Sequence, residues 1–187
     1  MDVLRRLSIA KKIYLIPLIG TISFMIYLAL ASNTALNNVH TLEQTRDVQF
    51  PVLQSAQSSL VLLERVKDSL ASAVTTGDEE ALGGAAAFSK QLTKELNNIS
   101  QLNRDYASDV QSILQSYDAY YQVAYKVSQE MINNTADFST LAQRSEKMNA
   151  DYDNTARLLG QFRDTRLKAF TSAIDAASEQ AGIGVDA

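Results

Sequence analysis

Few residues of this 187-residue chain could carry out chemistry. The sequence has no cysteine and a single histidine, His40, so it offers no thiolate ligand, no cysteine nucleophile and no histidine-rich metal site. It contains no phosphate-binding loop, no nucleophile elbow and no zinc or calcium motif. Its carboxylates alternate with Lys, Arg, Ser and Gln, which is typical of solvent-exposed helix faces. We therefore predict that the chain is not an enzyme and holds neither a metal nor a cofactor.

Four residues are instead candidates for binding a small solute, because residue counting places them in one layer of a helical bundle. Each lies about two to three helical turns from a predicted chain reversal, at Gly77 or at Asn134. Phe88 and Met148 are expected in the same layer. The candidate ligand-binding residues are Arg65, Lys67, Tyr121 and Arg144.

The residue types in this layer predict the chemistry of the ligand. Three cations buried together without an anion would be unfavourable, so the expected ligand is a small anionic solute that carries a carboxylate. Tyr121 would also accept the ring of an aromatic acid. In the alternative, Glu64, Asp68 and Glu146 neutralise the cations and the layer is only structural.

The elements that would position these residues are helices. Helix-forming residues fill long stretches of the chain, and its two prolines are Pro17 and Pro51. Apolar residues recur at spacings of three and four, the period of helices packed in a bundle. The predicted inward positions are Val39, Leu42, Leu53, Ala56, Leu60, Leu63, Leu70 and Val74 in the first helix, Leu82, Phe88, Leu92, Leu96 and Ile99 in the second, Val110, Ile113, Leu114, Tyr117, Tyr121, Ala124, Val127 and Met131 in the third, and Phe138, Leu141, Met148, Tyr152, Leu159, Phe162, Ala169 and Ala173 in the last. We predict an all-α fold, an antiparallel up-down-up-down four-helix bundle with long first and last helices. The helices are expected at about residues 32–76, 78–102, 106–132 and 137–181.

Capping residues define the predicted helix boundaries. Gly77 can adopt the left-handed conformation that ends a helix, and Asp78 can cap the next one. Asp137 is expected to cap the last helix in the same way. Pro51 should bend the first helix or lie at a local break in it.

An uncharged, apolar run at residues 13–31 precedes the predicted bundle. Its length is close to the roughly 20 residues that a transmembrane helix needs. Residues 1–12 carry a net charge of +3, and the next charge after the run is Glu43, so the positive-inside rule places residues 1–12 in the cytoplasm. We predict a single-pass protein of the bacterial inner membrane with a periplasmic domain at residues 32–187. In the alternative, Ala29-Leu30-Ala31 is a cleavage site and the run is a secretory signal peptide.

Charge also bears on the partners. The net charge is −4, so the chain after residue 12 carries −7, and we expect no nucleic-acid partner. Several polar residues fall at otherwise apolar positions of the first and last helices, where they would extend to solvent, pair with acids such as Asp68 and Asp164, or set the register of a dimer. These residues are Arg46, Gln49, Lys67 and Arg166.

A basic start, one apolar span and the segment QFPVLQSAQSSLVLLERVKDSLASAVTTGDEEAL together resemble a known family. The chain resembles the N-terminal sensory half of bacterial methyl-accepting chemotaxis receptors with a four-helix-bundle ligand-binding domain. The resemblance implies a ligand-sensing extracytoplasmic module that passes solute binding, through changes in helix packing, to a cytoplasmic signalling part absent from this chain. Sensor halves of histidine kinases and diguanylate cyclases share this architecture. A membrane-tethered protein-interaction bundle with no small ligand is the other alternative.

The segment from Leu60 to Leu63 is apolar in all directions around the first helix. One bundle seam cannot bury all four residues, so a second helical surface is expected to cover them. In the resembled family the first helix packs against its counterpart, which implies a homodimer through the first helix.

Overall fold

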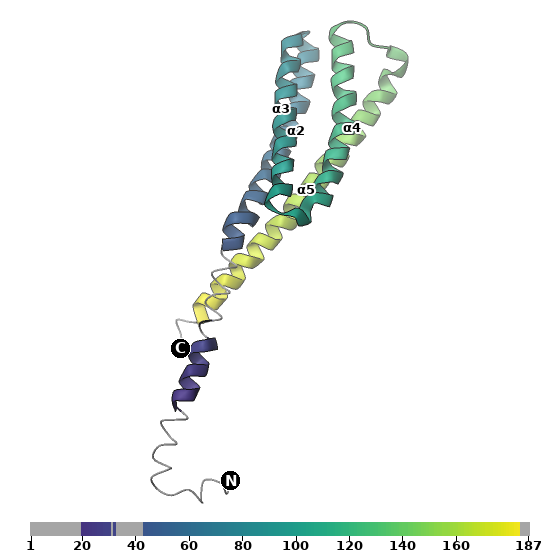
Figure 1. The fold of residues 1–187 in the computed structure, drawn as a ribbon. Helices are drawn as coiled ribbons and strands as arrows, with labels where there is room; N and C mark the ends of the chain where they lie inside the picture. Colours follow the sequence, from purple (N-terminus) through teal and green to yellow (C-terminus); the bar gives the residue numbers. More distant parts are fainter. Residues whose placement is uncertain (1–19, 31, 33–42, 184–187) are drawn as a thin grey trace, which may run out of the picture. The chain divides into compact units, whose positions relative to one another are not determined.

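The computed structural model describes residues 20–30, 32 and 43–183, and these residues are helical apart from short turns, with no strand among them (Figure 1). The predicted all-α class is therefore confirmed. By internal contacts the chain divides into two units, of which residues 44–175 form the larger. The larger unit is a helical bundle, and the predicted ligand-binding residues all lie in it.

Helices α2 (Phe50–Thr76) and α3 (Glu79–Leu102) share the most extensive helix–helix contact in the bundle. Gly77, with φ of 65°, ends α2 in the left-handed conformation that glycine adopts without strain. The Asp78 carboxylate then accepts a hydrogen bond of 2.8 Å from the Glu80 backbone N–H and caps α3. Both residues thus act as the sequence predicts.

Two further turns complete the bundle. After Asn103, a short 3₁₀ helix, η3 (Arg104–Tyr106), leads into α4 (Ala107–Ile132). A second turn leads to α5 (Phe138–Ile183), whose first turn is capped by Asp137 through a 3.0 Å hydrogen bond from the Ser139 N–H. The predicted cap at Asp137 is confirmed.

The predicted break at Pro51 takes a specific form. A π-helical segment, η2 (Thr45–Gln49), precedes α2, and Pro51 occupies the first turn of α2. Residues 43–76 are helical without interruption, so the break is a change of helix type: proline has no N–H to donate to the preceding turn, and that turn is the wider π-helical one. The regular first helix therefore begins at Phe50, and residues 33–42 of its predicted extent lie outside the described residues.

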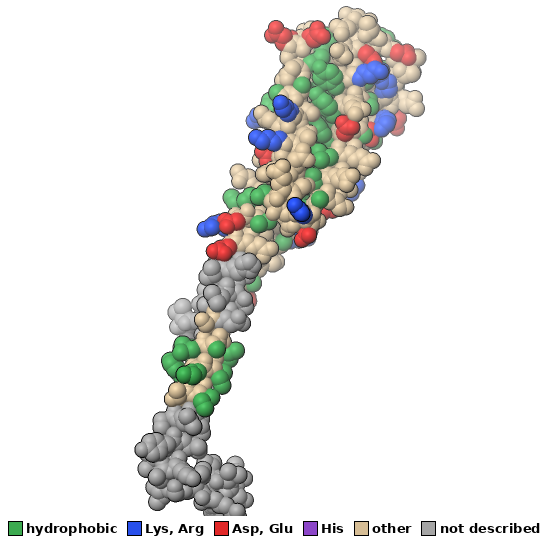
Figure 2. Space-filling model, viewed as in Figure 1, with side chains coloured by type: hydrophobic (Ala, Val, Ile, Leu, Met, Phe, Trp, Pro, Cys, Tyr) green, Lys and Arg blue, Asp and Glu red, His purple; other side chains and the backbone are tan. Residues whose placement is uncertain are grey.

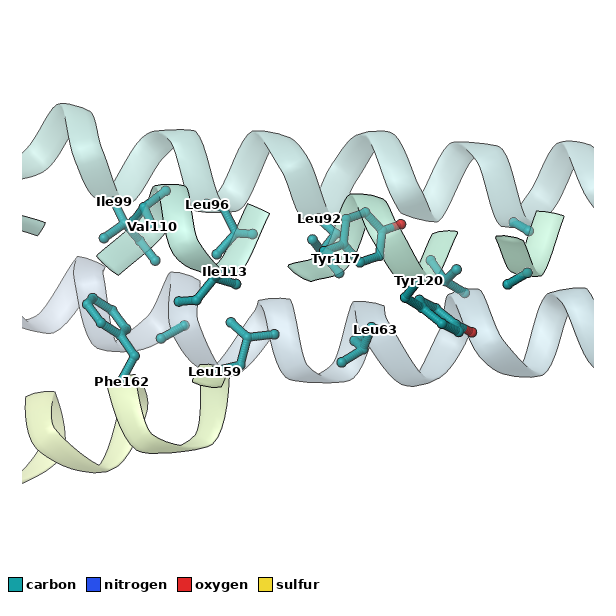
Figure 3. Packing of buried hydrophobic residues seen from close by; sticks show 14 of the residues in the cluster. Leu63, Leu92, Leu96, Ile99, Val110, Ile113, Tyr117, Tyr120, Leu159 and Phe162 are labelled. Atoms are coloured by element: carbon teal, nitrogen blue, oxygen red, sulfur yellow. The ribbon is translucent and has the colours of Figure 1, made fainter. Parts of the chain in front are cut away.

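The core is a continuous apolar cluster drawn mainly from α2, α3 and α4 (Figure 3). Leu92, Leu96 and Ile99 of α3 are completely buried in it. Helix α5 contributes Leu159 and Phe162 to this cluster. Buried apolar residues that the sequence pattern did not place in the core are Val52, Val66, Ala73, Ala85 and Tyr120.

Two predicted core positions of α5 are wrong. Phe138 is 76% exposed because it begins the helix at the very edge of the bundle. Ala169 is also exposed. The η3 turn lies beside Phe162, where the ring centroids of Tyr106 and Phe162 are 5.7 Å apart, so α3 and α4 have ended before α5 reaches Ala169.

Residues 20–30 form a helical segment of the smaller unit, and apolar side chains cover its visible surface (Figure 2). Phe24, Met25, Tyr27 and Leu30 are each at least 60% exposed. No helix within the described residues is both long and apolar enough to cross a membrane. Residues 1–19 and 31, which include the predicted cytoplasmic segment and part of the predicted membrane helix, lie outside the described residues, so the membrane span stays a prediction.

Candidate functional site

Arg65 lies on the outer side of the α2–α3 pair. Its guanidinium carbon is 5.5 Å from the centroid of the Phe88 ring, within the range of a cation–π contact. The sequence correctly predicted that these two residues lie at one height. Arg65 also lines an open groove of about 350 Å³, together with Glu95.

Lys67 contacts a different helix. Its Nζ lies 4.2 Å from the centroid of the Tyr152 ring of α5. Two residues along an α-helix differ by about 200° in direction, so Arg65 and Lys67 extend toward different neighbours. They do not line one pocket.

Arg144 is already neutralised by an acid of α4. Its Nη1 forms a half-buried ion pair with Glu130 Oε2. This hydrogen bond from Arg144 is the main reason why the pKa of Glu130 is lowered. The acids that the alternative reading offered as partners of the cations were Glu64, Asp68 and Glu146, and Arg144 pairs with Glu130 instead. The expectation that three cations converge is also wrong, because Arg65, Lys67 and Arg144 each contact a different partner.

Tyr121 belongs to a row of aromatic rings on α4. Its ring stacks on Tyr117 at 5.7 Å and lies 5.7 Å from Tyr125. Tyr120 extends from an adjacent face of α4. Its ring packs edge to face against that of Tyr152 on α5, with 5.3 Å between the ring centroids. Burial is the largest influence on Tyr117, Tyr120 and Tyr121 and raises the pKa of each. The row packs the bundle internally, and ligand binding by Tyr121 stays a prediction.

The contact between α4 and α5 is polar at its centre, which the sequence analysis missed. Ser116 Oγ and Thr155 Oγ1 are 2.9 Å apart, and Asn154 Nδ2 donates to Ser116 Oγ at 2.8 Å. Thr155 is completely buried and also donates to the Asp151 carbonyl at 2.8 Å. The sequence did contain a signal: the apolar positions of α5 are interrupted between Tyr152 and Leu159, and Thr155 lies in this interval. A threonine can be buried there because its hydroxyl can donate to a backbone carbonyl of the preceding helical turn.

A cavity of about 270 Å³ lies between α4 and α5 near the η3 turn. Arg166 forms part of its wall, with its guanidinium carbon 4.5 Å from the Tyr106 ring centroid and 5.4 Å from that of Phe162. The Nε atom of Arg166 is buried without a hydrogen-bond partner in the described part of the chain. The cavity is lined by Asp109, Ser112, Ile113, Leu158, Gln161, Phe162, Thr165 and Arg166.

The other polar residues noted at apolar positions have varied environments. Arg46 is exposed and pairs with Asp47 at 2.7 Å. Gln49 has a buried side-chain oxygen without a hydrogen-bond partner among the described residues. Asp164, one of the acids considered as partners for these residues, pairs with Arg163, and Arg166 lies against aromatic rings.

Metal binding finds no support in the described residues, where no group of three or more potential ligands from His, Cys, Asp and Glu gathers. No protein-family profile, curated protein or solved structure matches this chain. The resemblance to chemotaxis receptors therefore rests on the sequence features alone.

Proposed function

We propose that the chain is the membrane-anchored sensor module of a bacterial signal transducer of the chemotaxis-receptor type. It would have a transmembrane helix at residues 13–31 and an antiparallel up-down-up-down four-helix bundle in the periplasm. Solute binding to the bundle would change the packing of α5 and so reach the membrane. The observation that carries this proposal is the way in which α5 is attached.

Helix α5 is held much less firmly than its neighbours. Of its described side chains, Thr155, Leu159 and Phe162 alone are buried. Its other apolar contacts come from residues that are only partly buried, namely Met148, Tyr152, Ala156 and Leu158, and its contact with α4 includes the polar pair of Ser116 and Thr155. A helix with few buried apolar contacts has a low free-energy cost of local displacement. This makes α5 the suitable element to move against a firmly packed α2–α3 pair.

The arrangement of the outer helices supports a route to the membrane. The rings of Phe50, at the start of α2, and Phe170, late in α5, are 6.2 Å apart. The chain therefore enters and leaves the bundle at the same end. The exposed apolar residues of segment 20–30 require an apolar environment, which a bilayer supplies.

A disulfide between α4 and α5 tests this function without knowledge of the ligand. The short distance between the Ser116 and Thr155 hydroxyls makes S116C/T155C a suitable pair in this cysteine-free chain. The chain would be fused after Ala187 to a second span and a cytoplasmic kinase-controlling domain. We expect the oxidised pair to hold kinase output at one level, changed several-fold from the reduced protein and restored by a reductant.

A matched disulfide between α2 and α3 is the control. A Cβ built at Gly84 would lie 3.2 Å from Ser69 Oγ, so S69C/G84C can close a bond between the helices that should not move. This control should leave output unchanged. Complete oxidation of S116C/T155C with no change in output would contradict signalling through α5.

The proposal includes a homodimer through α2. The sequence argued for it from four apolar residues in a row, whereas in the structure the argument rests on one exposed residue, Val61. Leu63 is 1% exposed, Leu60 and Leu62 are partly buried against the core, and Val61 is 43% exposed. The chain's own helices thus cover most of the segment from Leu60 to Leu63, and the expected need for a second helix holds for Val61 alone. Val61 lies in the middle of the solvent-facing stripe of α2, which comprises Gln54, Gln57, Val61, Arg65, Asp68 and Ser72.

Crosslinking in intact cells tests the dimer and the membrane orientation together. In V61C, a membrane-impermeant thiol crosslinker should give a dimer-sized band in the membrane fraction. The matched variant K94C, exposed on α3, should react as a monomer. Equal crosslinking of both variants would remove the α2 interface, and failure of the impermeant reagent to reach either cysteine would contradict the periplasmic location.

A further inference from the structure

The α4–α5 cavity at Arg166 has a composition that suits one class of ligand. Asp109 belongs to the first turn of α4, and Arg166 belongs to α5, so the two charges come from different helices. Neither residue forms an ion pair with another residue in the described part of the chain. An acid and a base thus line one cavity without neutralising each other.

We propose that this cavity binds a small zwitterion, whose carboxylate contacts Arg166 and whose ammonium group contacts Asp109. Arg166 lines the cavity and has no ion pair among the described residues, so its guanidinium can donate charge-assisted hydrogen bonds to a ligand carboxylate. The Tyr106 and Phe162 rings lie against the guanidinium and hold it in place.

The charge pair distinguishes a zwitterion from simpler ions. A plain anion would gain from Arg166 but would be repelled by Asp109, and a plain cation would meet the reverse situation. A neutral solute would leave both charges without a counter-ion. A zwitterion of suitable length satisfies both at once.

The remaining walls define the size and side chain of the ligand. Ile113, Leu158 and Phe162 provide apolar surface, while Ser112 and Thr165 add hydroxyl groups. A volume of about 270 Å³ lies just below the usual range for pockets of drug-sized ligands, so the ligand must be small. Glycine and amino acids with short apolar side chains fit this description.

This inference rests on the proposed sensor function, because it names the class of solute that the sensor would detect. A ligand that touches Asp109 on α4 and Arg166 on α5 favours the packing in which both contacts form. The site differs from the layer of Arg65, Lys67, Tyr121 and Arg144, which lies near the other turns of the bundle. No residue is shared between the two sites.

Binding to the full chain in detergent micelles, measured by isothermal titration calorimetry, tests the proposal. The probes are glycine, L-alanine and L-valine, each compared with analogues that lack one charge, such as 3-methylbutanoate and isobutylamine for valine. We expect at least one amino acid to bind saturably with one site per chain, and both of its analogues to bind at least tenfold more weakly. No saturable binding by any of the three, or equal binding of an analogue, would overturn the proposal.

Matched variants assign the two contacts. D109N should weaken amino-acid binding at least tenfold and remove the preference over the analogue without an ammonium group. R166Q should remove the preference over the analogue without a carboxylate. The controls D105N and K168Q replace exposed charges outside the cavity and should bind as the parent does.

The exposed position of Asp109 makes D109N tolerable for folding, so this variant decides the matter if R166Q is unstable. Unchanged affinity in folded D109N would overturn the ammonium contact. The measurement uses no signalling output, so its failure would leave the S116C/T155C experiment on α5 informative. Conversely, failure of that experiment would leave the binding result standing.

Discussion

Replacing Leu96 by alanine is expected to lower the free energy of unfolding by about 2–5 kcal/mol, the range for buried leucines whose cavity stays partly open. Leu96 is completely buried in the second half of α3, between α2 and α4 (Figure 3). These helices pack on both sides of it and cannot collapse far into the space left by the lost methyl groups. Denaturant unfolding of the full chain in detergent micelles, followed by circular dichroism, measures the loss.

Leu167→Ala is the matched control because it makes the same chemical change at a side chain that is 46% exposed on α5. We expect it to change the free energy of unfolding by about 0.5 kcal/mol or less. If the two variants lose equal stability, then the core does not lie where α2, α3 and α4 meet.

Raising the pH above about 10 is expected to destabilise the bundle steeply through Tyr117 and Tyr120. Burial raises the pKa of both phenols well above the ordinary value of 10.0, and nearby Ser89 lowers that of Tyr117 by less. Above pH 10 the unfolded chain therefore releases protons that the folded chain retains, so the free energy of unfolding falls as the pH rises. For one fully buried phenol, the fall is about 1.4 kcal/mol for each pH unit above 10.

Tyr117→Phe separates this effect from general alkaline damage. The Tyr117 hydroxyl is buried and makes no hydrogen bond of acceptable geometry in the described residues, so its removal should cost little or no stability at pH 7. Unfolding curves between pH 8 and pH 11.5 should show a shallower fall for Tyr117→Phe than for the parent, and a shallower one again with Tyr120→Phe added. Identical slopes in all variants would show that these phenols do not ionise on unfolding.

Local signals in the sequence were sufficient for the helices and their turns. Gly77, Asp78 and Asp137 act through their own backbone conformations and through hydrogen bonds to residues two positions away. Such interactions depend on neighbours in the chain, so the residue types alone determine them. The apolar period likewise placed Leu92, Leu96 and Ile99 in the core, because an inward helix face needs no knowledge of its partner.

The environments of the candidate site residues depended on tertiary structure. Counting residues from a turn gives the height of a side chain along the bundle, and it correctly brought Arg65 to the level of Phe88. Height does not determine direction, and Arg65 and Lys67 extend toward different helices. The choice of Glu130 as the partner of Arg144 depended on the rotation of α4 against α5.

The sequence by itself determined an all-helical chain, the positions of its main turns and most of its buried apolar stripe, because these follow from backbone preferences and a single period. Only the tertiary structure decided that α5 is held by Thr155, Leu159 and Phe162, and that Arg166 and Asp109 line one cavity without pairing. The physical reason is that a charge at an apolar position can reach solvent, an acid or an aromatic ring at similar cost. Which of these three environments the charge reaches depends on how the neighbouring helices are rotated and where they end. Residues distant in the sequence determine both the rotation and the helix ends.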